Sequence, residues 1–502
     1  MRQRPLWAAL LATAAFAGHV SAADLRIGLQ EDPDALDPAQ ARTFVGRIVF
    51  ESLCDKLVNI DNAGNFVPEL ATEWAWSADG MTLTMKLRTD AKFHDGEPIN
   101  AAAVVANIER GKTLEESRRK SELASVASVA ATGEHEVVFT LTKPDATLVA
   151  QLSDRAGMLV SPKAAAELGA GLGKNPVCSG EFKFVERIDQ DRIVLEKFAD
   201  HWNAANVHID RVIFLPIPDT TVRLANLRSG DLHMLERLAP SDVAGVKADA
   251  ALKFESAVSQ GYQGITVNVN NGARSETPFG KDARVRQALS LAIDREVVNQ
   301  VVFEGVYAPG NQPFPPTSVW YDQSNPVQPR DVAKAKALLA EAGVTGRLAI
   351  EMQAANNPVQ LQLMQVIQAM AAEAGIDISI KATEFATMLN EQTAGNYDST
   401  QVGWSGRTDP DGNIHAFVTC KGGLNDSKFC NDKVEALLNE ARTSTDQAVR
   451  KAKYDEAGKI LAEELPIIYL YHQTWLWAMK AGVSGFVPYP DGMIRLAGVK
   501  VE

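Results

Sequence analysis

Residues 348–380 contain a strand–helix–strand pattern, which constrains the fold more than any other part of the chain. Residues 348–352 form an apolar strand, residues 359–374 have helical spacing and stop at Gly375, and residues 376–380 form a second apolar strand. Two strands joined through a helix by short links pair in parallel, with a right-handed crossover. The pattern predicts the α/β class, and a further strand over residues 396–402 is a candidate for the same sheet.

The length of the chain calls for more than one hydrophobic core. A chain of 502 residues exceeds the size of an ordinary single domain, so two or three domains are expected. Hydrophobic residues make up 46% of the chain and charged residues 23%, which is typical of a globular protein and excludes a disordered one.

The N-terminal segment predicts export. Arg2 and Arg4 precede an apolar run over residues 6–18, and small residues follow at a cleavage site near Ala22 or Ala23. The apolar run is too short to span a bilayer, and no later stretch is long and apolar enough to do so. Residues 1–23 are therefore predicted to be a signal peptide.

The net charge argues against two classes of partner. Removing the signal segment, which carries Arg2 and Arg4 and no acidic residue, changes the formal charge from −13 to −15. An acidic exported protein is a poor partner for nucleic acid or for anionic lipid. The charge says little about the ligand.

The four cysteines predict two disulfides, because an even count in an oxidising compartment favours pairing. Cys420 and Cys430 are close in sequence, across a loop rich in Gly, Asn, Asp and Ser, and Cys54 then pairs with Cys178 by elimination. Metal binding is the alternative, but no CxxC motif or Cys/His cluster supports it.

The stretch GWSGRTDPDGN, residues 403–413, is the strongest candidate for a site. It follows the strand that ends at Gly403 and has the composition of a loop. Ligands of open α/β sheets bind outside the carboxyl ends of strands. Trp404, Arg407 and Asp409 offer an aromatic face, a cation and an anion for a small zwitterion. The alternative is a surface loop whose tryptophan fills the core.

Catalytic and cofactor motifs are incomplete. The stretch from Gly403 has Arg407 where a nucleophile elbow needs its second glycine. His135-Glu136 lacks the second histidine of a zinc protease, and residues 169–174 fit neither a phosphate loop nor a dinucleotide loop. The sequence thus gives no support for an enzyme, a cofactor or a metal site.

Several stretches together resemble the extracellular solute-binding proteins of family 5, which serve peptide and opine ABC transporters. The matching stretches are LATEWAWSADGMTLTMKLRTDAKFHDGEPINAAAVVANIER from Leu70, PVCSGEFKFVE from Pro176, RLANLRSGDLHML from Arg223, DARVRQALSLAIDRE from Asp282, and GWSGRTDPDGN with the Cys420–Cys430 loop. These matches run from about residue 24 to the C-terminus. They are specific to the family and not to one ligand.

The resemblance implies a two-lobed α/β fold, the type II periplasmic-binding-protein fold with an extra domain and a ligand cleft between the lobes. Lobe I is expected to take residues 24–60, 177–264 and 481–502, with the extra domain at residues 61–176. Lobe II is expected at residues 265–480. The crossings near Gly264 and Lys480 would form the hinge, about which the lobes close on ligand.

The resemblance also implies site residues. In dipeptide-binding relatives, the aspartate that matches Asp409 pairs with the ligand's α-amino group, and the residue that matches Trp404 lines the pocket. The arginine that binds the ligand carboxylate in those relatives is missing, because residues 356–365 read NNPVQLQLMQ. Either Arg407 or Arg42 supplies that cation, or the ligand lacks a free carboxylate there.

Further candidates come from lobe I and from the first strand of lobe II. Arg42, Thr43 and Phe44 fall where relatives contact ligand, and the alternative is a helix N-terminus with a solvated Arg42. Tyr262 is a candidate for which the alternative is a core tyrosine at a strand end.

The function that the resemblance implies is that of a monomeric periplasmic receptor. It would capture a small peptide or amino-acid-derived solute and deliver it to an ABC permease and ATPase complex in the inner membrane. One alternative is a receptor for a non-peptide solute such as an opine, a sugar or a metal chelate. The other is an exported peptide hydrolase, which needs an activated Ser, Cys or metal-bound water, and the sequence shows no such set.

Overall fold

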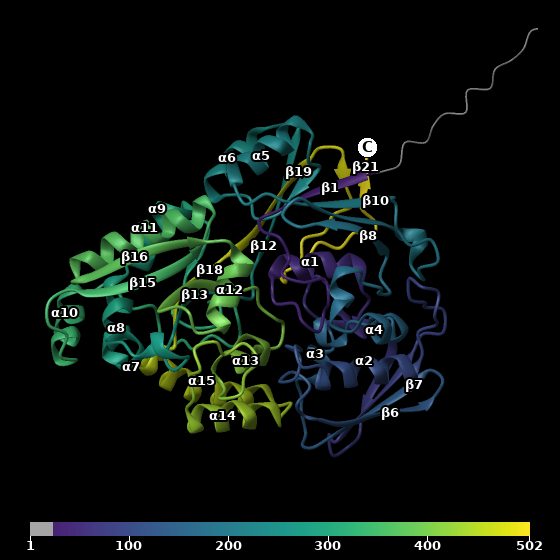
Figure 1. Cartoon of the computed structure of the whole chain (residues 1–502), viewed down its shortest axis with the longest axis horizontal. Helices are drawn as coiled ribbons and strands as arrows, with labels where there is room; N and C mark the ends of the chain where they lie inside the picture. The colour runs from purple at the N-terminus through teal and green to yellow at the C-terminus, as the bar shows by residue number, and fades with distance from the viewer. Residues whose placement is uncertain (1–23) are drawn as a thin grey trace, which may run out of the picture.

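The computed structural model describes residues 24–502, so the predicted signal peptide lies outside the described residues. The chain folds into two lobes and a third domain (Figure 1). We call lobe I the part built on a seven-stranded sheet, lobe II the part built on a six-stranded sheet, and the extra domain the part built on a four-stranded sheet. Within residues 24–502, every helix is too short or too polar to cross a membrane.

Lobe I has the strand order β12-β19-β11-β1-β10-β9-β8. Its strands are β1 (Asp24–Leu29), β8 (Phe182–Ile188), β9 (Arg192–Lys197), β10 (Arg211–Pro216), β11 (Met234–Leu235), β12 (Leu252–Val258) and β19 (Thr474–Lys480), and its helices are α1 (Phe44–Leu53), α5 (Thr220–Ser229) and α6 (Val243–Ala248). β1 lies parallel to β10 and β11. Helix α1 covers the sheet and is buried along most of its length.

Lobe II has the strand order β14-β18-β13-β17-β15-β16. Its strands are β13 (Tyr262–Val267), β14 (Ala308–Pro309), β15 (Leu348–Ala355), β16 (Ile376–Thr383), β17 (Ser399–Trp404) and β18 (Ile467–His472). Its helices are α7 (Pro278–Lys281), α8 (Ala283–Ala292), α9 (Arg295–Phe303), α10 (Val332–Glu341), α11 (Pro358–Glu373), α12 (Phe385–Thr393), α13 (His415–Val418), α14 (Asp432–Arg442) and α15 (Gln447–Glu464).

The strand–helix–strand unit predicted from residues 348–380 is confirmed. β15 pairs in parallel with β16 on one side and with β17 on the other, and α11 connects β15 to β16. Asn357 caps α11 by accepting a hydrogen bond from the Gln360 backbone nitrogen at 3.0 Å. Gly375 follows the helix with φ +89, a left-handed conformation that favours glycine.

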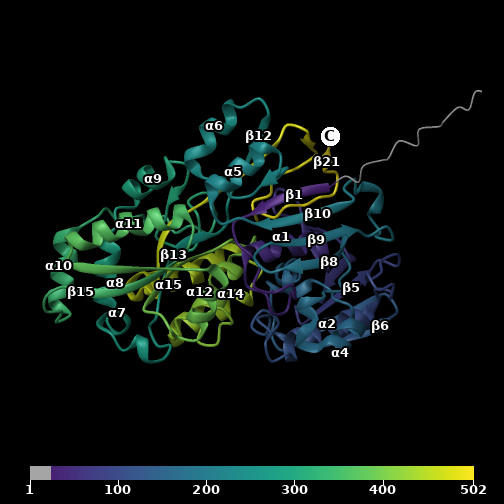
Figure 2. The same cartoon turned by 45° about the horizontal axis from the view of Figure 1, so that its top comes forward.

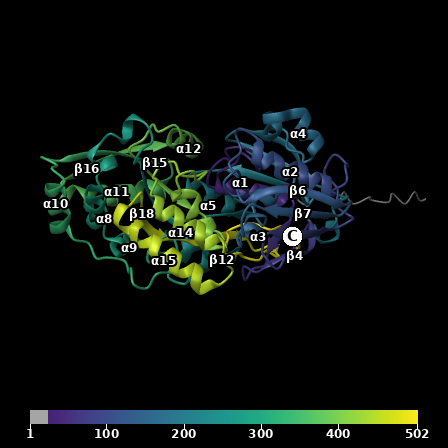
Figure 3. The same cartoon turned by 90° about the horizontal axis from the view of Figure 1, so that it is seen from below.

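The extra domain lies next to lobe I, and both lie on the same side of lobe II (Figures 1 and 3). Its antiparallel sheet has the order β4-β5-β7-β6. The elements are β2 (Val58–Ile60), β3 (Phe66–Pro68), β4 (Ala71–Trp76), β5 (Thr82–Leu87), β6 (Val126–Gly133), β7 (Glu136–Leu141), α2 (Ala101–Thr113), α3 (Leu148–Gln151) and α4 (Pro162–Leu168). Its apolar core runs from Leu57 to Leu159 and is separate from the cores of the lobes.

The chain crosses between the lobes twice, and both crossings lie earlier than expected. β12 belongs to the sheet of lobe I and β13 to that of lobe II, so the first crossing takes residues 259–261. β18 belongs to lobe II and β19 to lobe I, which places the second crossing at Gln473 and not near Lys480. Both strands are almost fully buried, so their continuous apolar sequence does not show where the chain changes sheets. Figure 2 shows the lobes on either side of these connections.

The two predicted disulfides are present. Cys420 bonds to Cys430 across 10 residues, and Cys54 bonds to Cys178 across 124 residues. The second bond joins the end of α1 to the segment that re-enters lobe I, and it closes a loop that contains the whole extra domain. Helix α1 ends at Leu53, because Cys54 is extended and enters this bond.

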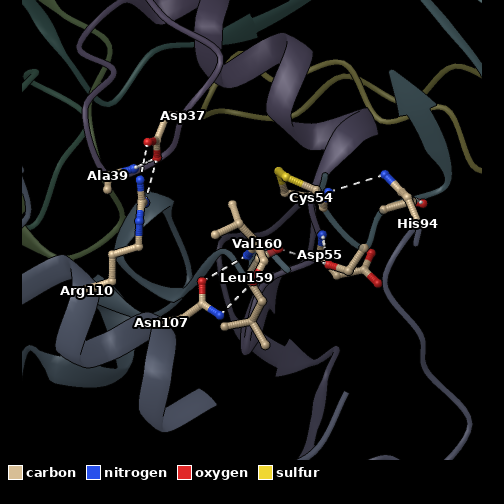
Figure 4. Close-up of a disulfide and its surroundings, with 12 residues drawn as sticks. Asp37, Ala39, Cys54, Asp55, His94, Asn107, Arg110, Leu159 and Val160 are labelled. Atoms are coloured by element: carbon tan, nitrogen blue, oxygen red, sulfur yellow. Dashed lines mark hydrogen bonds and ion pairs between the residues drawn. A yellow bond between two sulfur atoms is a disulfide. The ribbon is translucent and has the colours of Figure 1, made fainter. Parts of the chain in front are cut away.

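Polar contacts beside the Cys54–Cys178 bond attach the extra domain to lobe I (Figure 4). Arg110 of α2 binds both carboxylate oxygens of Asp37, at 2.5 and 3.0 Å. The Asn107 side chain bonds both backbone groups of Val160 at 2.9 Å, and the Val160 side chain lies in the apolar core of lobe I. These contacts hold the extra domain against the lobe at several points besides the covalent link.

Candidate ligand-binding site

A pocket lies between the two lobes, and both supply its walls. Lobe I contributes residues that follow β1 and β11 and the N-terminus of α1. Lobe II contributes β13, the carboxyl end of β17, the first turn of α11 and one side of α12. Of the candidates named from the sequence, those that line this pocket are Arg42, Thr43, Phe44, Tyr262 and Trp404. Arg407 and Asp409 lie behind its wall.

Three aromatic rings in the pocket are each fixed by a second ring. Phe44 stacks on Trp475 with ring centroids 4.4 Å apart, and Tyr262 meets Tyr469 edge-on at 4.8 Å. Trp404 meets Phe417 edge-on at 4.8 Å, and its indole nitrogen donates a 3.1 Å hydrogen bond to Asn413. Rings held in this way give rigid apolar faces that lose little conformational freedom when a ligand binds.

Arg42 reaches across the pocket from lobe I to lobe II. Its guanidinium lies 2.5 Å from Asp426 and donates to the Leu389 carbonyl at 3.2 Å and to Thr393. The Arg42 donors thus make hydrogen bonds between the lobes. They are not solvated, which was the alternative considered for this segment. Thr43 caps α1, since its hydroxyl accepts from the Gly46 backbone nitrogen at 3.2 Å.

Arg407 lies on the far side of Trp404. Its guanidinium is 4.2 Å from the centroid of the indole ring and 2.7 Å from Asp154 of the extra domain. Arg47 of α1 binds the same carboxylate at 2.6 Å. Although burial opposes ionisation, these two guanidinium groups hold the pKa of Asp154 well below its usual range. Arg407 therefore supports Trp404 and joins lobe II to the extra domain.

Asp409 differs most from the sequence-based expectation. Its two oxygens accept hydrogen bonds from Arg450 of α15 at 2.6 and 2.9 Å, inside lobe II. One of them also accepts from the Asp411 backbone nitrogen at 3.0 Å. The side chain turns toward α15 because Asp409 caps a short 3-10 helix over Pro410–Asn413. In this arrangement its carboxylate is bound within lobe II and does not line the pocket.

Two charged residues of the pocket, Glu31 and Arg237, were not among the candidates. Glu31 is 5% exposed, makes no hydrogen bond, and has one carboxylate oxygen buried without a partner. Burial raises the pKa of Glu31 to about 7, and Arg237 opposes that shift from 3.5 Å away. The Arg237 guanidinium stacks on the Phe44 ring at 4.6 Å, and its Nε has no hydrogen-bond partner.

Of the two missed residues, only Glu31 had a signal in the sequence. Glu31 follows the first strand, and in open α/β folds the ends of strands carry ligand-binding residues. Arg237 follows β11, which is only two residues long and has no clear pattern. Arg237 has φ +49, a conformation that is uncommon for a residue other than glycine and is found most often at functional sites.

Amide side chains line much of the remaining pocket wall. They come from Gln30, Gln263, Gln360, Gln392, Gln401 and Gln473. Gln401 donates to Gln263 at 3.3 Å, and Gln263 donates to Gln473 at 3.2 Å, so three of them form a chain. Buried amide atoms of Gln473 and Gln360 have no partner. Unpartnered buried donors and acceptors predict a ligand rich in polar groups.

Metal ligands do not converge on the pocket. Within residues 24–502, the one group of three potential metal ligands is Cys420, Cys430 and Asp432, and its two cysteines are bonded to each other. The pocket wall consists of aromatic, amide and charged groups.

The family model for bacterial extracellular solute-binding proteins, family 5, matches residues 65–425. The chain belongs to this family. Its fold agrees with solved family members: a dipeptide binding protein from Pseudoalteromonas sp. SM9913 in complex with Met-Leu has a TM-score of 0.88 at 24% identity, over 95% of this chain and 100% of that one.

Two further similar proteins are named for, or were solved with, different solutes. Di/tripeptide-binding protein 1 of Pseudomonas aeruginosa is 29% identical over 93% of this chain and 92% of its own length. The binding protein AgaA of A. tumefacien R10, solved in complex with agropinic acid, is 26% identical, with a TM-score of 0.87 over 95% of this chain and 99% of that one. Relatives that are about equally similar to this chain thus bind different solutes.

Proposed function

We propose that the protein is exported to the periplasm, binds a small peptide or amino-acid-derived solute between its lobes, and delivers it to an ABC permease and ATPase complex. The observation that carries this proposal is the pocket, whose rigid aromatic faces lie beside charged and amide groups without partners. Such a surface binds a solute with both apolar and polar parts. The relative named for di- and tripeptides and the one solved with agropinic acid support this class of solute.

We assign the predicted residues to two roles. Phe44, Tyr262 and Trp404 contact the solute directly. Arg42 and Arg407 act by holding the closed arrangement, since each binds a carboxylate of another domain. The protein releases its solute unchanged, as expected of a chain whose family and relatives are named for solute binding.

Calorimetric titration of the protein lacking residues 1–23 tests the proposal. The panel consists of dipeptides, tripeptides, opines, sugars and metal chelates, together with any solute that native mass spectrometry finds on the purified protein. We expect binding by a peptide or another amino-acid derivative, with no product after prolonged incubation. Binding of sugars or metal chelates alone contradicts the proposed class, and hydrolysis of a bound peptide contradicts a receptor role.

A further inference from the structure

We propose that Glu31 and Arg237 bind the head group of an α-amino acid, with the ligand's α-ammonium on Glu31 and its α-carboxylate on Arg237. The ligand would be a conjugate joined through the amino acid's side chain, as in a γ-glutamyl compound. This inference rests on the proposed function and specifies the solute class of the same pocket.

The two residues have hydrogen-bonding capacity that the protein leaves unused. One carboxylate oxygen of Glu31 is buried without a hydrogen-bond partner, and so is the Nε of Arg237, which lies 3.5 Å from Glu236. Their closest atoms are 3.5 Å apart, which is too long for a direct hydrogen bond. Buried charged groups are normally hydrogen-bonded as well as paired, so a ligand that supplies these bonds is expected to be favoured.

The Arg237 guanidinium is held in place from behind. It stacks on the Phe44 ring at 4.6 Å. Arg223 of α5 donates a hydrogen bond to the Arg237 backbone carbonyl at 2.9 Å. A planar guanidinium fixed in this way suits a carboxylate, which it binds through two parallel hydrogen bonds.

The charges around the pair favour a ligand group with no net charge. The charges of Arg237, Glu236, Arg223 and, from lobe II, Glu384 all act on the Glu31 carboxyl, so the pair lies among buried groups of both signs. One oxygen of Glu236 accepts from the Gln30 backbone nitrogen at 2.6 Å and the other lies 3.5 Å from Arg237, and Glu236 does not line the pocket. A zwitterionic head group adds an ammonium and a carboxylate together, so it leaves the net charge of this buried cluster unchanged, whereas a single added charge changes it.

The short separation selects the linkage of the ligand. In an amino-acid head group the ammonium and carboxylate share one carbon, so both reach groups 3.5 Å apart. In an ordinary dipeptide they lie at opposite ends, up to about 7 Å apart when extended. The rest of a side-chain-linked conjugate then extends toward the aromatic and amide walls of lobe II.

Calorimetric titration with γ-L-glutamyl-L-leucine and α-L-glutamyl-L-leucine tests this inference, because the two isomers have the same atoms and differ in linkage. We expect the γ isomer to bind at least about tenfold more tightly. Glu31→Gln and Arg237→Gln should each weaken its binding by about tenfold to a few hundredfold, since removing one partner leaves the other charge unpaired. Arg237→Lys should give an intermediate loss, because it keeps the charge without the two-pronged geometry.

A second ion pair of lobe I supplies matched controls. Arg192 and Glu186 lie 2.8 Å apart on β9 and β8 and are 39% and 44% exposed. Arg192→Gln and Glu186→Gln should leave the affinity for the γ isomer unchanged. Melting curves of the ligand-free variants show whether each is folded.

The outcomes separate this inference from the proposed function. Equal binding of the isomers, tighter binding of the α isomer, or an isomer preference that survives in both pocket variants overturns the role of Glu31 and Arg237. Binding of an α-linked peptide without the γ isomer overturns it while leaving the receptor function in place. If no amino-acid derivative binds at all, both proposals fail.

Discussion

Asp409 and Arg450 form an ion pair inside lobe II, below the loop that carries Trp404. Arg450 also lies 3.2 Å from the Tyr454 hydroxyl and 5.4 Å from the centroid of the Trp320 ring. The pair thus connects the loop to α15 in a largely buried place. We infer that the carboxylate is needed for the position of Trp404 more than for direct contact with ligand.

Asp409→Asn is expected to lower the melting temperature of the ligand-free protein. Removing one partner of a buried pair costs about 3–5 kcal/mol when the other charge stays uncompensated, and the amide recovers part of it. Ligand affinity should fall only slightly. Thermal denaturation and calorimetric titration check this. A large loss of affinity at unchanged melting temperature would instead support a direct bond from Asp409 to the ligand.

Glu31 predicts a pH dependence of stability. Its pKa is raised by burial from 4.5 to about 7 in the folded protein, so between these values the folded state keeps a proton that the unfolded state has lost. The free energy of unfolding therefore falls as pH rises through this range, by about 3 kcal/mol from this group. Glu31→Gln should remove that part of the fall. A difference between variant and parent that stays constant from pH 4.5 to 7.5 would contradict this.

The sequence could predict only those site residues whose place in the pocket follows from their position at the end of a strand or helix. Trp404 ends a strand, and Phe44 begins a helix, so both were found from local pattern and resemblance. Asp409 is five residues beyond Trp404, but a short 3-10 helix turns its side chain away from the pocket. Arg237 meets Glu31 only because β11 lies next to β1 in the sheet, and single-sequence patterns do not show that pairing.

At the scale of elements, the α/β run of lobe II was predictable because helical and strand periodicities alternate there with clear stops. The crossings between the lobes were not predictable. β18 and β19 belong to different sheets, but both are buried on both faces and have similar apolar compositions. The disulfides followed from counting cysteines. The stabilisation that each disulfide gives depends on the segment inside the loop that it closes, and the fold is needed to see that segment.

Loss of the Cys54–Cys178 bond should destabilise the protein more than loss of the Cys420–Cys430 bond. The chain-entropy model gives about 5 kcal/mol for the 124-residue loop and about 3 kcal/mol for the 10-residue loop. Thermal denaturation of the two double alanine variants compares them. Because Asp37–Arg110 and Asn107–Val160 also attach the extra domain, the first variant should still fold. A larger effect from the short loop would contradict the loop-length argument.

At the scale of the whole molecule, polar contacts connect the three parts in one closed arrangement. Arg42 of lobe I binds Asp426 of lobe II, and Arg407 of lobe II binds Asp154 of the extra domain. Arg47 of α1 binds both Asp154 and, at 2.8 Å, the Ser405 hydroxyl in the pocket wall. The extra domain therefore takes part in closure, because its Asp154 is shared between the lobes.

Arg42→Ala is expected to shift the protein toward an open state. In the closed state it leaves Asp426 buried without its cation, at a cost of about 1–3 kcal/mol, whereas in an open state water hydrates that carboxylate. The ligand should therefore dissociate about tenfold faster, and small-angle X-ray scattering should give a larger radius of gyration. Arg274→Ala is the control, since Arg274 pairs with Asp398 and Glu351 inside lobe II.

A double variant separates closure from direct ligand binding by Arg42. If Arg42 acts through Asp426, then adding Asp426→Ala to Arg42→Ala removes the unpaired charge and restores part of the slow dissociation. If Arg42 instead binds a ligand carboxylate, the double variant loses as much affinity as the single one, because the missing cation is not replaced. The radius of gyration of the ligand-free double variant then tells whether the lobes close without either charge, since apolar contacts across the pocket would have to hold them together.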